Sequence, residues 1–205
     1  MMVSPQRELY AAIAGLHLNK LYSDLTIAST TKEYAVHRAI ICTRSEFFAG
    51  WCRSRFKEVD AGILSLPDDD PSVVDAMIRY FYHLDYDVPV KRPQGQGDTR
   101  LLFNAKMYTL ADKYLIHGLK DLAVSKFKSA SSKHETVDIQ DFLDATQVAY
   151  SYTNENDRVL REAVLETFVN HKVLLDKEET QDMLKETDML AYDVLLYFRQ
   201  RRSIG

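Results

Sequence analysis

The chain has 205 residues, a net charge of −4 at neutral pH and 46% hydrophobic residues. This composition is typical of a globular protein of one domain, or of one domain with an extension, and not of a disordered chain. The negative charge argues against a nucleic-acid-binding domain, which is normally strongly basic. The apolar runs are far shorter than the ~20 residues that span a bilayer, and the N-terminal residues lack the pattern of a secretory signal.

The chain contains only two cysteines, Cys42 and Cys52. Two cysteines cannot form the disulfide framework of a small secreted domain. Both stand among apolar residues, where a cysteine usually acts as a small buried hydrophobe. We therefore expect a reduced, intracellular protein, located in the cytoplasm, the nucleus or both.

The first residues predict a helix followed by a β-hairpin. Ser4 followed by Pro5 is typical of a helix start, with serine at the cap and proline at the first helical position. Apolar and polar residues alternate over residues 25–28 and again over 34–38, around a turn-like segment at 29–32, which predicts two paired strands. The first helix carries one apolar stripe at three- and four-residue spacing, made of Leu9, Ala12, Ile13 and Leu16.

Short elements follow the hairpin. Residues 39–42 have no polar face and predict a short buried helix, and Ser45 can cap a second helix over 46–51 that is rich in aromatic residues. Residues 63–66 predict a short strand. The clearest helix begins at Asp70-Pro71, where the three consecutive aspartates act as a turn and a helix cap rather than as a catalytic cluster. Its apolar stripe consists of Val74, Met77, Ile78 and Phe81.

The rest of the chain is predicted to be helical. Proline and glycine predict a loop over residues 85–100, and Gly118 is expected to interrupt a helical pattern that runs from 101 to 127. Strands confined to the first half and helices throughout the second predict an α+β part followed by an all-α part. After a small polar break at 130–135, further helices are expected at residues 139–149, 158–171, 178–185 and 189–199.

Four stretches occur in one order along the chain: residues 22–27 (YSDLTI), 34–48 (YAVHRAIICTRSEFF), 66–71 (LPDDDP) leading to 80–82 (YFY), and 110–115 (LADKYL) followed by 118–120 (GLK). Together they resemble the BTB/POZ domain family, and the C-terminal helices are similar, more loosely, to the helical tails of fungal members. The resemblance implies a BTB/POZ fold, a small sheet with surrounding helices, followed by an all-α C-terminal extension. The expected parts are an N-terminal amphipathic helix at 1–20, a BTB/POZ domain at 21–128 and a helical extension at 136–205.

The resemblance also implies a homodimer. In members that act in transcription, an acidic residue at the position of Asp24 and a basic residue at that of Arg38 line a charged pocket at the dimer interface. Alternatively, Asp24 ends a turn and Arg38 is solvated. Leu9, Ile13 and Leu16 are predicted to pair the first helix with a second copy, the alternative being that this stripe packs within its own subunit.

Residues 56–58 (FKE) match a hydrophobic–any–glutamate motif that cullin-binding members carry just after the aromatic helix. There Phe56 would fill a pocket on the cullin and Glu58 would add a polar contact. Phe48 and Trp51, in the preceding helix, are expected on the same partner-binding surface. Two departures bear on this surface, because Trp51 is larger than the usual residue and residues 53–55 (RSR) stand where glycine is frequent.

We therefore expect a non-catalytic interaction module that self-associates and serves as an adaptor or scaffold, and specifically as a substrate adaptor of a cullin-RING ubiquitin ligase. The alternative is a homodimerising scaffold in transcription or signalling that binds no cullin. The third hypothesis is an enzyme of unrecognised chemistry, which would require a deep pocket with converging titratable residues. The sequence has no zinc-ligand spacing, phosphate-binding loop or nucleophile motif, so we assign no catalytic residue, metal or cofactor and expect neither nucleic acid nor a membrane as partner.

Overall fold

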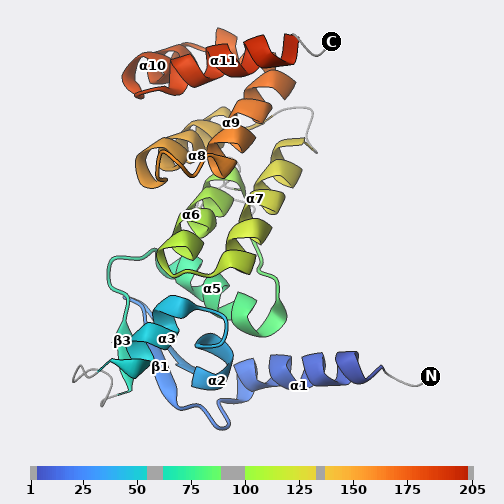
Figure 1. Ribbon diagram of the computed structural model, residues 1–205, viewed down its shortest axis with the longest axis vertical. Coiled ribbons are helices and arrows are strands. Elements are labelled where there is room, and N and C mark those ends of the chain that lie inside the picture. Colours follow the sequence, from blue (N-terminus) through green and yellow to red (C-terminus); the bar gives the residue numbers. More distant parts are fainter. Residues whose placement is uncertain (1–3, 55–61, 89–99, 133–136, 203–205) are drawn as a thin grey trace. The chain divides into compact units, whose positions relative to one another are not determined.

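The computed structural model describes residues 4–54, 62–88, 100–132 and 137–202. The chain divides into two compact units (Figure 1). The first contains Met1–Asp87 and Leu110–Lys120, and the second contains Val88–Thr109 and Asp121–Gly205. This division differs from the boundaries that we expect from sequence at residues 20 and 128, which remain predictions.

The first unit combines a small sheet with helices, as the sequence predicts for an α+β fold. The paired strands and the long capped helix are confirmed at their predicted places. The elements that begin in this unit are α1 (Pro5–Asn19), β1 (Leu25–Ala28), β2 (Glu33–Val36), α2 (Arg38–Ile41), α3 (Glu46–Arg53), β3 (Ile63–Ser65) and α5 (Pro71–His83).

The sheet has the strand order β2-β1-β3. β1 pairs antiparallel with β2, with Leu25 opposite Val36, and it pairs parallel with β3, with Ile27 opposite Leu64. These four side chains are buried, because alternate residues of a strand point to the same face of the sheet. The hydroxyl of Ser29 closes the hairpin turn by accepting a hydrogen bond from the backbone N–H of Lys32 at 3.1 Å.

α5 forms the centre of the first unit. The Asp70 carboxylate accepts a hydrogen bond from the N–H of Ser72 at 3.0 Å, and Pro71 occupies the first turn, as the sequence predicts. The predicted stripe is buried, and so are four further residues, which means that the helix is covered on more than one side. The buried residues are Val73, Val74, Ala76, Met77, Ile78, Tyr80, Phe81 and Tyr82.

The prediction of a buried helix at 39–42 is wrong for most of its residues. In α2 only Ile41 is buried, whereas Ala39 is exposed and Ile40 is half-buried. A four-residue helix is barely one turn long, so it can turn only part of its surface towards the core. The remaining apolar surface of α2 faces away from the core of this unit.

The helical pattern after residue 100 breaks at Leu115, not at Gly118. α6 (Arg100–Lys113) and α7 (His117–Ser132) are separated by a short turn in which Leu115 takes a left-handed conformation with φ of 52°. Gly118 lies inside the first turn of α7. A Cβ atom there would stand 2.6 Å from the hydroxyl oxygen of Tyr80, so the position requires glycine for a close approach.

The regular elements in the described residues of the second unit are all helices, as the sequence predicts for the C-terminal part. A buried carboxylate begins α6, because Asp141 accepts hydrogen bonds from the backbone N–H groups of Leu101 and Leu102 at 2.8 and 2.9 Å. Phe142 and Phe168 meet edge to face with ring centroids 4.8 Å apart. Besides parts of α6 and α7, the unit contains α8 (Ile139–Tyr152), α9 (Val159–Asn170), the 3-10 helix η2 (Lys172–Asp176), α10 (Glu178–Glu186) and α11 (Leu190–Arg202).

Candidate protein-interaction surfaces

The helix α1 is well formed but scarcely covered. Ser4 caps it as predicted, by accepting a hydrogen bond from the N–H of Arg7, and Pro5 occupies the first turn. None of the fifteen residues of α1, all of which the structure describes, is buried. In Figure 1, α1 runs outward from the other elements of the first unit. Its packing within the subunit therefore leaves much of its surface open.

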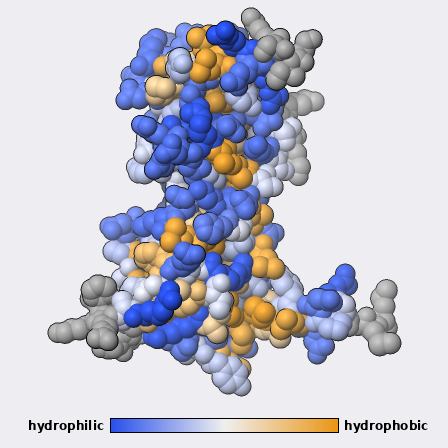
Figure 2. Space-filling view, in the orientation of Figure 1, coloured by the Kyte–Doolittle hydropathy of each residue, from blue (hydrophilic) through white to orange (hydrophobic). Residues whose placement is uncertain are grey.

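The predicted stripe lies partly on this open surface. The side chain of Leu9 is 63% exposed, whereas Ile13 and Leu16 are half-buried. Further exposed apolar residues follow the end of the helix, among them Leu21 and Tyr22. Figure 2 shows hydrophobic residues gathered where α1 meets the rest of the first unit.

Polar aromatic groups attach α1 to α5. The Tyr10 hydroxyl donates a hydrogen bond to the backbone oxygen of His83 at 2.6 Å. Nδ1 of His17 lies 3.0 Å from Nε2 of His83, and the His17 ring stacks on that of Tyr82 with centroids 5.2 Å apart. Tyr10 and His17 are seven positions apart and so share one helix face. That face lies on α5, and the neighbouring face carries Leu9, which is 63% exposed, and Leu16, which is half-buried.

The two histidines of this contact resist protonation. Burial, followed by the nearby His83, lowers the pKa of His17 below its ordinary value of 6.5. Burial, followed by the nearby Arg79, lowers the pKa of His83. Two neutral imidazoles can share one hydrogen bond, whereas two protonated rings would repel each other at this distance. Sequence reasoning missed this pair, because the residues are 66 positions apart and no local pattern relates them.

The structure brings Asp24 and Arg38 together within one subunit. Oδ1 of Asp24 accepts a hydrogen bond from the backbone N–H of Arg38 at 2.8 Å. Asp24 therefore holds the start of α2, which agrees with a local role for this residue. The Nε atom of Arg38 is buried and has no hydrogen-bond partner within the described part of the chain.

His37 has the structural role that its residue type suggests. Its side chain is 6% exposed, and its two ring nitrogens lie 2.8 Å from the Tyr82 hydroxyl and 2.6 Å from the backbone oxygen of Leu21. One imidazole can serve both neighbours, because one nitrogen donates while the other accepts. The residue thereby joins β2 to α5 and to the segment after α1.

The aromatic residues of α3 differ in exposure. Phe48 has no exposed surface, and its ring contacts those of Phe81 and Tyr114 at centroid distances of 5.9 and 5.4 Å. Its side chain fills the core of the first unit, so it is not available to a partner as we expected from sequence. Trp51 is half-buried and keeps part of its surface open. The predicted motif residues Phe56 and Glu58 lie outside the described residues.

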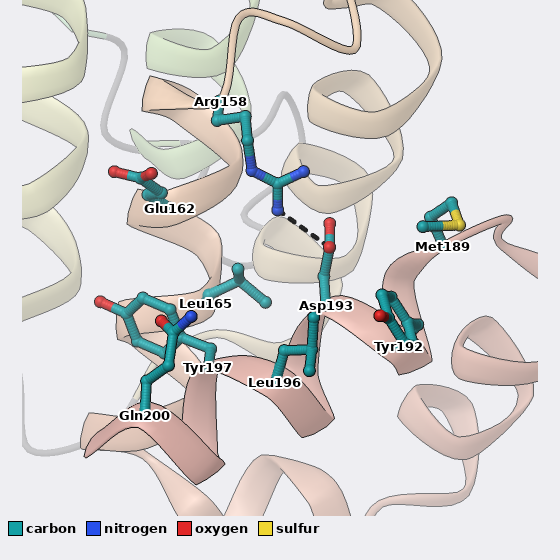
Figure 3. A pocket seen from close by; sticks show the side chains of 9 residues that line it. All are labelled: Arg158, Glu162, Leu165, Met189, Tyr192, Asp193, Leu196, Tyr197 and Gln200. Carbon is teal, nitrogen blue, oxygen red and sulfur yellow. Dashed lines mark ion pairs between the residues drawn. The ribbon is translucent and has the colours of Figure 1, made fainter. Parts of the chain in front are cut away.

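A pocket of about 330 Å³ lies in the second unit between α9 and α11 (Figure 3). An ion pair belongs to its lining, where the Arg158 guanidinium meets the Asp193 carboxylate at 2.8 Å. The Tyr150 hydroxyl donates a second bond to Asp193 at 3.0 Å, and burial followed by Asp193 raises the pKa of this phenol. The pocket is lined by Arg158, Glu162, Leu165, Met189, Tyr192, Asp193, Leu196, Tyr197 and Gln200.

The ion pair in this pocket is satisfied by its own members and by Tyr150. Asp193 is 4% exposed and binds both Arg158 and Tyr150, which is the arrangement of a structural ion pair. Arg158 is held as a cation, because the hydrogen bond to Asp193 raises its pKa. Among the pocket residues in Figure 3 we find no nucleophile next to a base.

No helix within the described ranges is both long and apolar enough to cross a membrane. Histidine, cysteine and acidic residues do not gather in groups of three or more that could hold a metal ion in the part of the chain that the structure describes.

Comparison with known proteins gives one consistent result. The sequence pattern of the BTB/POZ domain matches residues 14–131. Kelch repeat and BTB domain-containing protein 4 of Homo sapiens is 31% identical over 64 residues, which are 31% of this chain and 12% of that protein. BTB/POZ and MATH domain-containing protein 6 of Arabidopsis thaliana is 25% identical over 166 residues, covering 69% of this chain and 38% of that protein. The matched segments thus span less than half the length of these relatives.

Among solved structures, the BTB domain of zebrafish PATZ1 is similar to this chain. The two share 16% sequence identity with a TM-score of 0.45, and the match covers 63% of this chain and 97% of the PATZ1 domain.

Proposed function

This chain belongs to the BTB/POZ domain family, and from that premise we propose that it is a protein-interaction module that self-associates through α1 and serves as an adaptor or scaffold. The observation that carries the proposal is the lack of any buried residue in α1, a helix of fifteen residues. A helix with an apolar stripe normally buries that stripe against another element. In this chain the occupant of the open face is a second copy.

The residues on α1 support this arrangement. Tyr10 and His17 fix the helix on α5, so the side chains on the adjoining face keep a defined orientation. Leu9 is 63% exposed and Leu16 is half-buried on that face. A helix of this length extends about 22 Å, which is enough for two copies to pack their stripes side by side.

The surface beyond α1 adds to the proposed interface. A stable dimer usually buries about 800 Å² per partner, more than one helix face offers. Leu21 and Tyr22 are 55% and 86% exposed and continue the apolar surface after the helix. Asp24 and Arg38, which lie together at the start of α2, supply opposite charges that a second copy can complement.

Self-association is tested by measuring the mass of the protein in solution by light scattering. We expect a dimer for the wild-type chain and a monomer for Leu9→Asp, because a carboxylate in a paired apolar stripe would be buried without a partner. Leu195→Asp is the matched control, since Leu195 is 66% exposed on α11 and lies outside the proposed interface. A monomeric wild type, or a Leu9→Asp variant that stays dimeric, would contradict the proposal.

The partner that we propose is the N-terminal domain of a cullin, which makes the chain a substrate adaptor of a ubiquitin ligase. The support comes from the sequence, because Phe56 and Glu58 form the hydrophobic–any–glutamate motif shortly after α3. Trp51, near the end of α3 and five positions before Phe56 in the sequence, is half-buried and offers a further aromatic surface. Large aromatic side chains commonly provide most of the binding energy of an interface. Such an adaptor would act in the cytoplasm or the nucleus.

Calorimetric titration with a cullin N-terminal domain from the same organism tests this partner. We expect micromolar or tighter binding, about −8 kcal/mol, that is lost in Glu58→Ala and kept in Glu33→Ala, a control on the exposed start of β2. If no heat is released while the dimer persists, the cullin role is excluded. The alternative function, a homodimerising scaffold that binds no cullin, then remains.

A further inference from the structure

The two cysteines of the chain face each other at close range. Cys42 follows α2 directly, and Cys52 lies in the last turn of α3, ten positions later. Their Sγ atoms are 3.2 Å apart. Both thiols are free and half-buried, so neither is the fully buried hydrophobe that we expect from sequence.

Local contacts fix this approach from both sides. Cys52 is four positions after Phe48, so it lies on the inward face of α3 that Phe48 anchors in the core. The backbone N–H of Cys42 donates to the oxygen of Arg38 at 2.8 Å. The hydroxyl of Thr43 donates to the oxygen of Ala39 at 2.8 Å. The two sulfur atoms are therefore opposed because the surrounding structure holds them there.

We propose that Cys42 and Cys52 form a redox-active pair that a hydroperoxide converts reversibly into an intrachain disulfide. A disulfide bond is about 2.05 Å long, so the sulfur atoms must approach by only ~1.2 Å from their present distance. Disulfides in reduced compartments are usually transient and serve redox sensing. A preformed dithiol is the arrangement that such chemistry requires.

The reaction balances with one hydroperoxide as the oxidant. The Cys52 sulfur attacks the distal peroxide oxygen, the O–O bond breaks, and the products are a sulfenic acid and an alcohol, or water when the oxidant is hydrogen peroxide. The Cys42 sulfur then attacks Sγ of Cys52, the S–S bond forms, and the hydroxyl group leaves with the Cys42 proton as water. The two sulfur atoms together lose two electrons and the peroxide gains two.

Burial and the contact between the thiols set this order. Cys42 directs its S–H at the sulfur of Cys52 at 3.2 Å. Burial, followed by this hydrogen bond, raises the pKa of Cys42 to about 12. Since the thiolate is the nucleophile, Cys52 reacts first and Cys42 resolves the sulfenic acid.

The pair is close in the sequence to two residues that we place on partner-binding surfaces. Arg38 is four positions before Cys42, and Trp51 directly precedes Cys52. A disulfide would join the end of α2 to the last turn of α3. Oxidation would thereby fix the position of Arg38 relative to Trp51.

The test is peroxide treatment of the reduced full chain, followed by unfolding in urea with N-ethylmaleimide and measurement of the intact mass. We expect the oxidised wild type to lose two hydrogens and take up no maleimide, and dithiothreitol to restore two maleimide additions. In Cys42→Ser, a sulfenic acid at Cys52 should persist and react with dimedone. In Cys52→Ser, Cys42 should stay reduced at neutral pH and take up one maleimide.

The wild-type measurement decides the proposal even if a variant fails to fold. Two maleimide additions after peroxide treatment would overturn it, and so would a disulfide that links two chains on a non-reducing gel. Oxidation of Cys42 in Cys52→Ser as fast as disulfide formation in the wild type would overturn the assigned order of reaction.

Discussion

Replacing Phe48 with alanine removes a ring that has no exposed surface and that contacts two further aromatic rings, those of Phe81 and Tyr114. A buried Phe→Ala change typically costs about 3–5 kcal/mol, through lost transfer energy and the cavity that remains. The aromatic contacts of Phe48 place it towards the upper end of this range. Since a domain is stable by only about 5–15 kcal/mol, we expect Phe48→Ala to remove a large part of the stability of the first unit.

The assay is equilibrium unfolding in urea, followed by the fluorescence of Trp51, the single tryptophan of the chain. Trp51 lies three positions from Phe48 in α3 and so reports on the first unit. Phe47→Ala is the matched control, because this neighbouring ring is only half-buried and should cost clearly less. A loss below about 1 kcal/mol in Phe48→Ala, or equal losses in both variants, would refute a core role for Phe48.

Three further predictions follow from single contacts. The pKa values of His17 and His83 are lowered in the folded chain, so the unfolded chain binds more protons just below pH 6.5. The stability of the α1–α5 contact should therefore fall as the pH drops below 6.5 and stay constant above it. Urea unfolding of the wild type and of His17→Phe at pH 5 to 8 tests this, and the same dependence of the free energy of unfolding on pH in both proteins would contradict it. Asp141→Ala should cost about 2 kcal/mol, because two N–H groups at the start of α6 lose their acceptor; thermal unfolding checks this, and an unchanged midpoint would oppose it. Gly118→Ala should destabilise the first unit, since the new Cβ meets the Tyr80 hydroxyl at 2.6 Å, and the added substitution Tyr80→Phe should recover part of the loss if that oxygen is the cause.

Much of the fold could be predicted because its signals are local. Asp70 and Pro71 predict the start of α5 from two adjacent residues. In the structure Asp70 caps the helix and Pro71 lies in its first turn. The hairpin is predicted by the alternation of apolar and polar residues on both sides of a turn-like segment. Ser29 closes that turn. Each of these signals depends on neighbours within a few positions, so the sequence alone is sufficient.

The candidate surfaces could be predicted only in part, because exposure depends on residues that are distant in sequence. Phe48 and Trp51 look alike in the sequence of α3. The rings of Phe81 and Tyr114, 33 and 66 positions after Phe48, contact Phe48 in the core. The contact between His17 and His83 likewise spans 66 positions. The approach of Cys42 to Cys52 depends on the geometry of two short helices and the turn between them.

The proposed interaction surfaces of the first unit rest on polar side chains that bind backbone oxygens across elements. The Arg44 guanidinium donates to the oxygen of Phe81 at 2.6 Å, and the Ser45 hydroxyl donates to the oxygen of Tyr114 at 2.6 Å. His37 makes a similar contact to Leu21 at 2.6 Å. Such bonds are directional and costly to break when buried, so they fix the angle at which α2, α3 and the end of α1 meet the core. Apolar packing alone would stabilise these short elements without orienting them, whereas the polar contacts hold their outward faces ready for a partner, which lowers the entropy cost of binding.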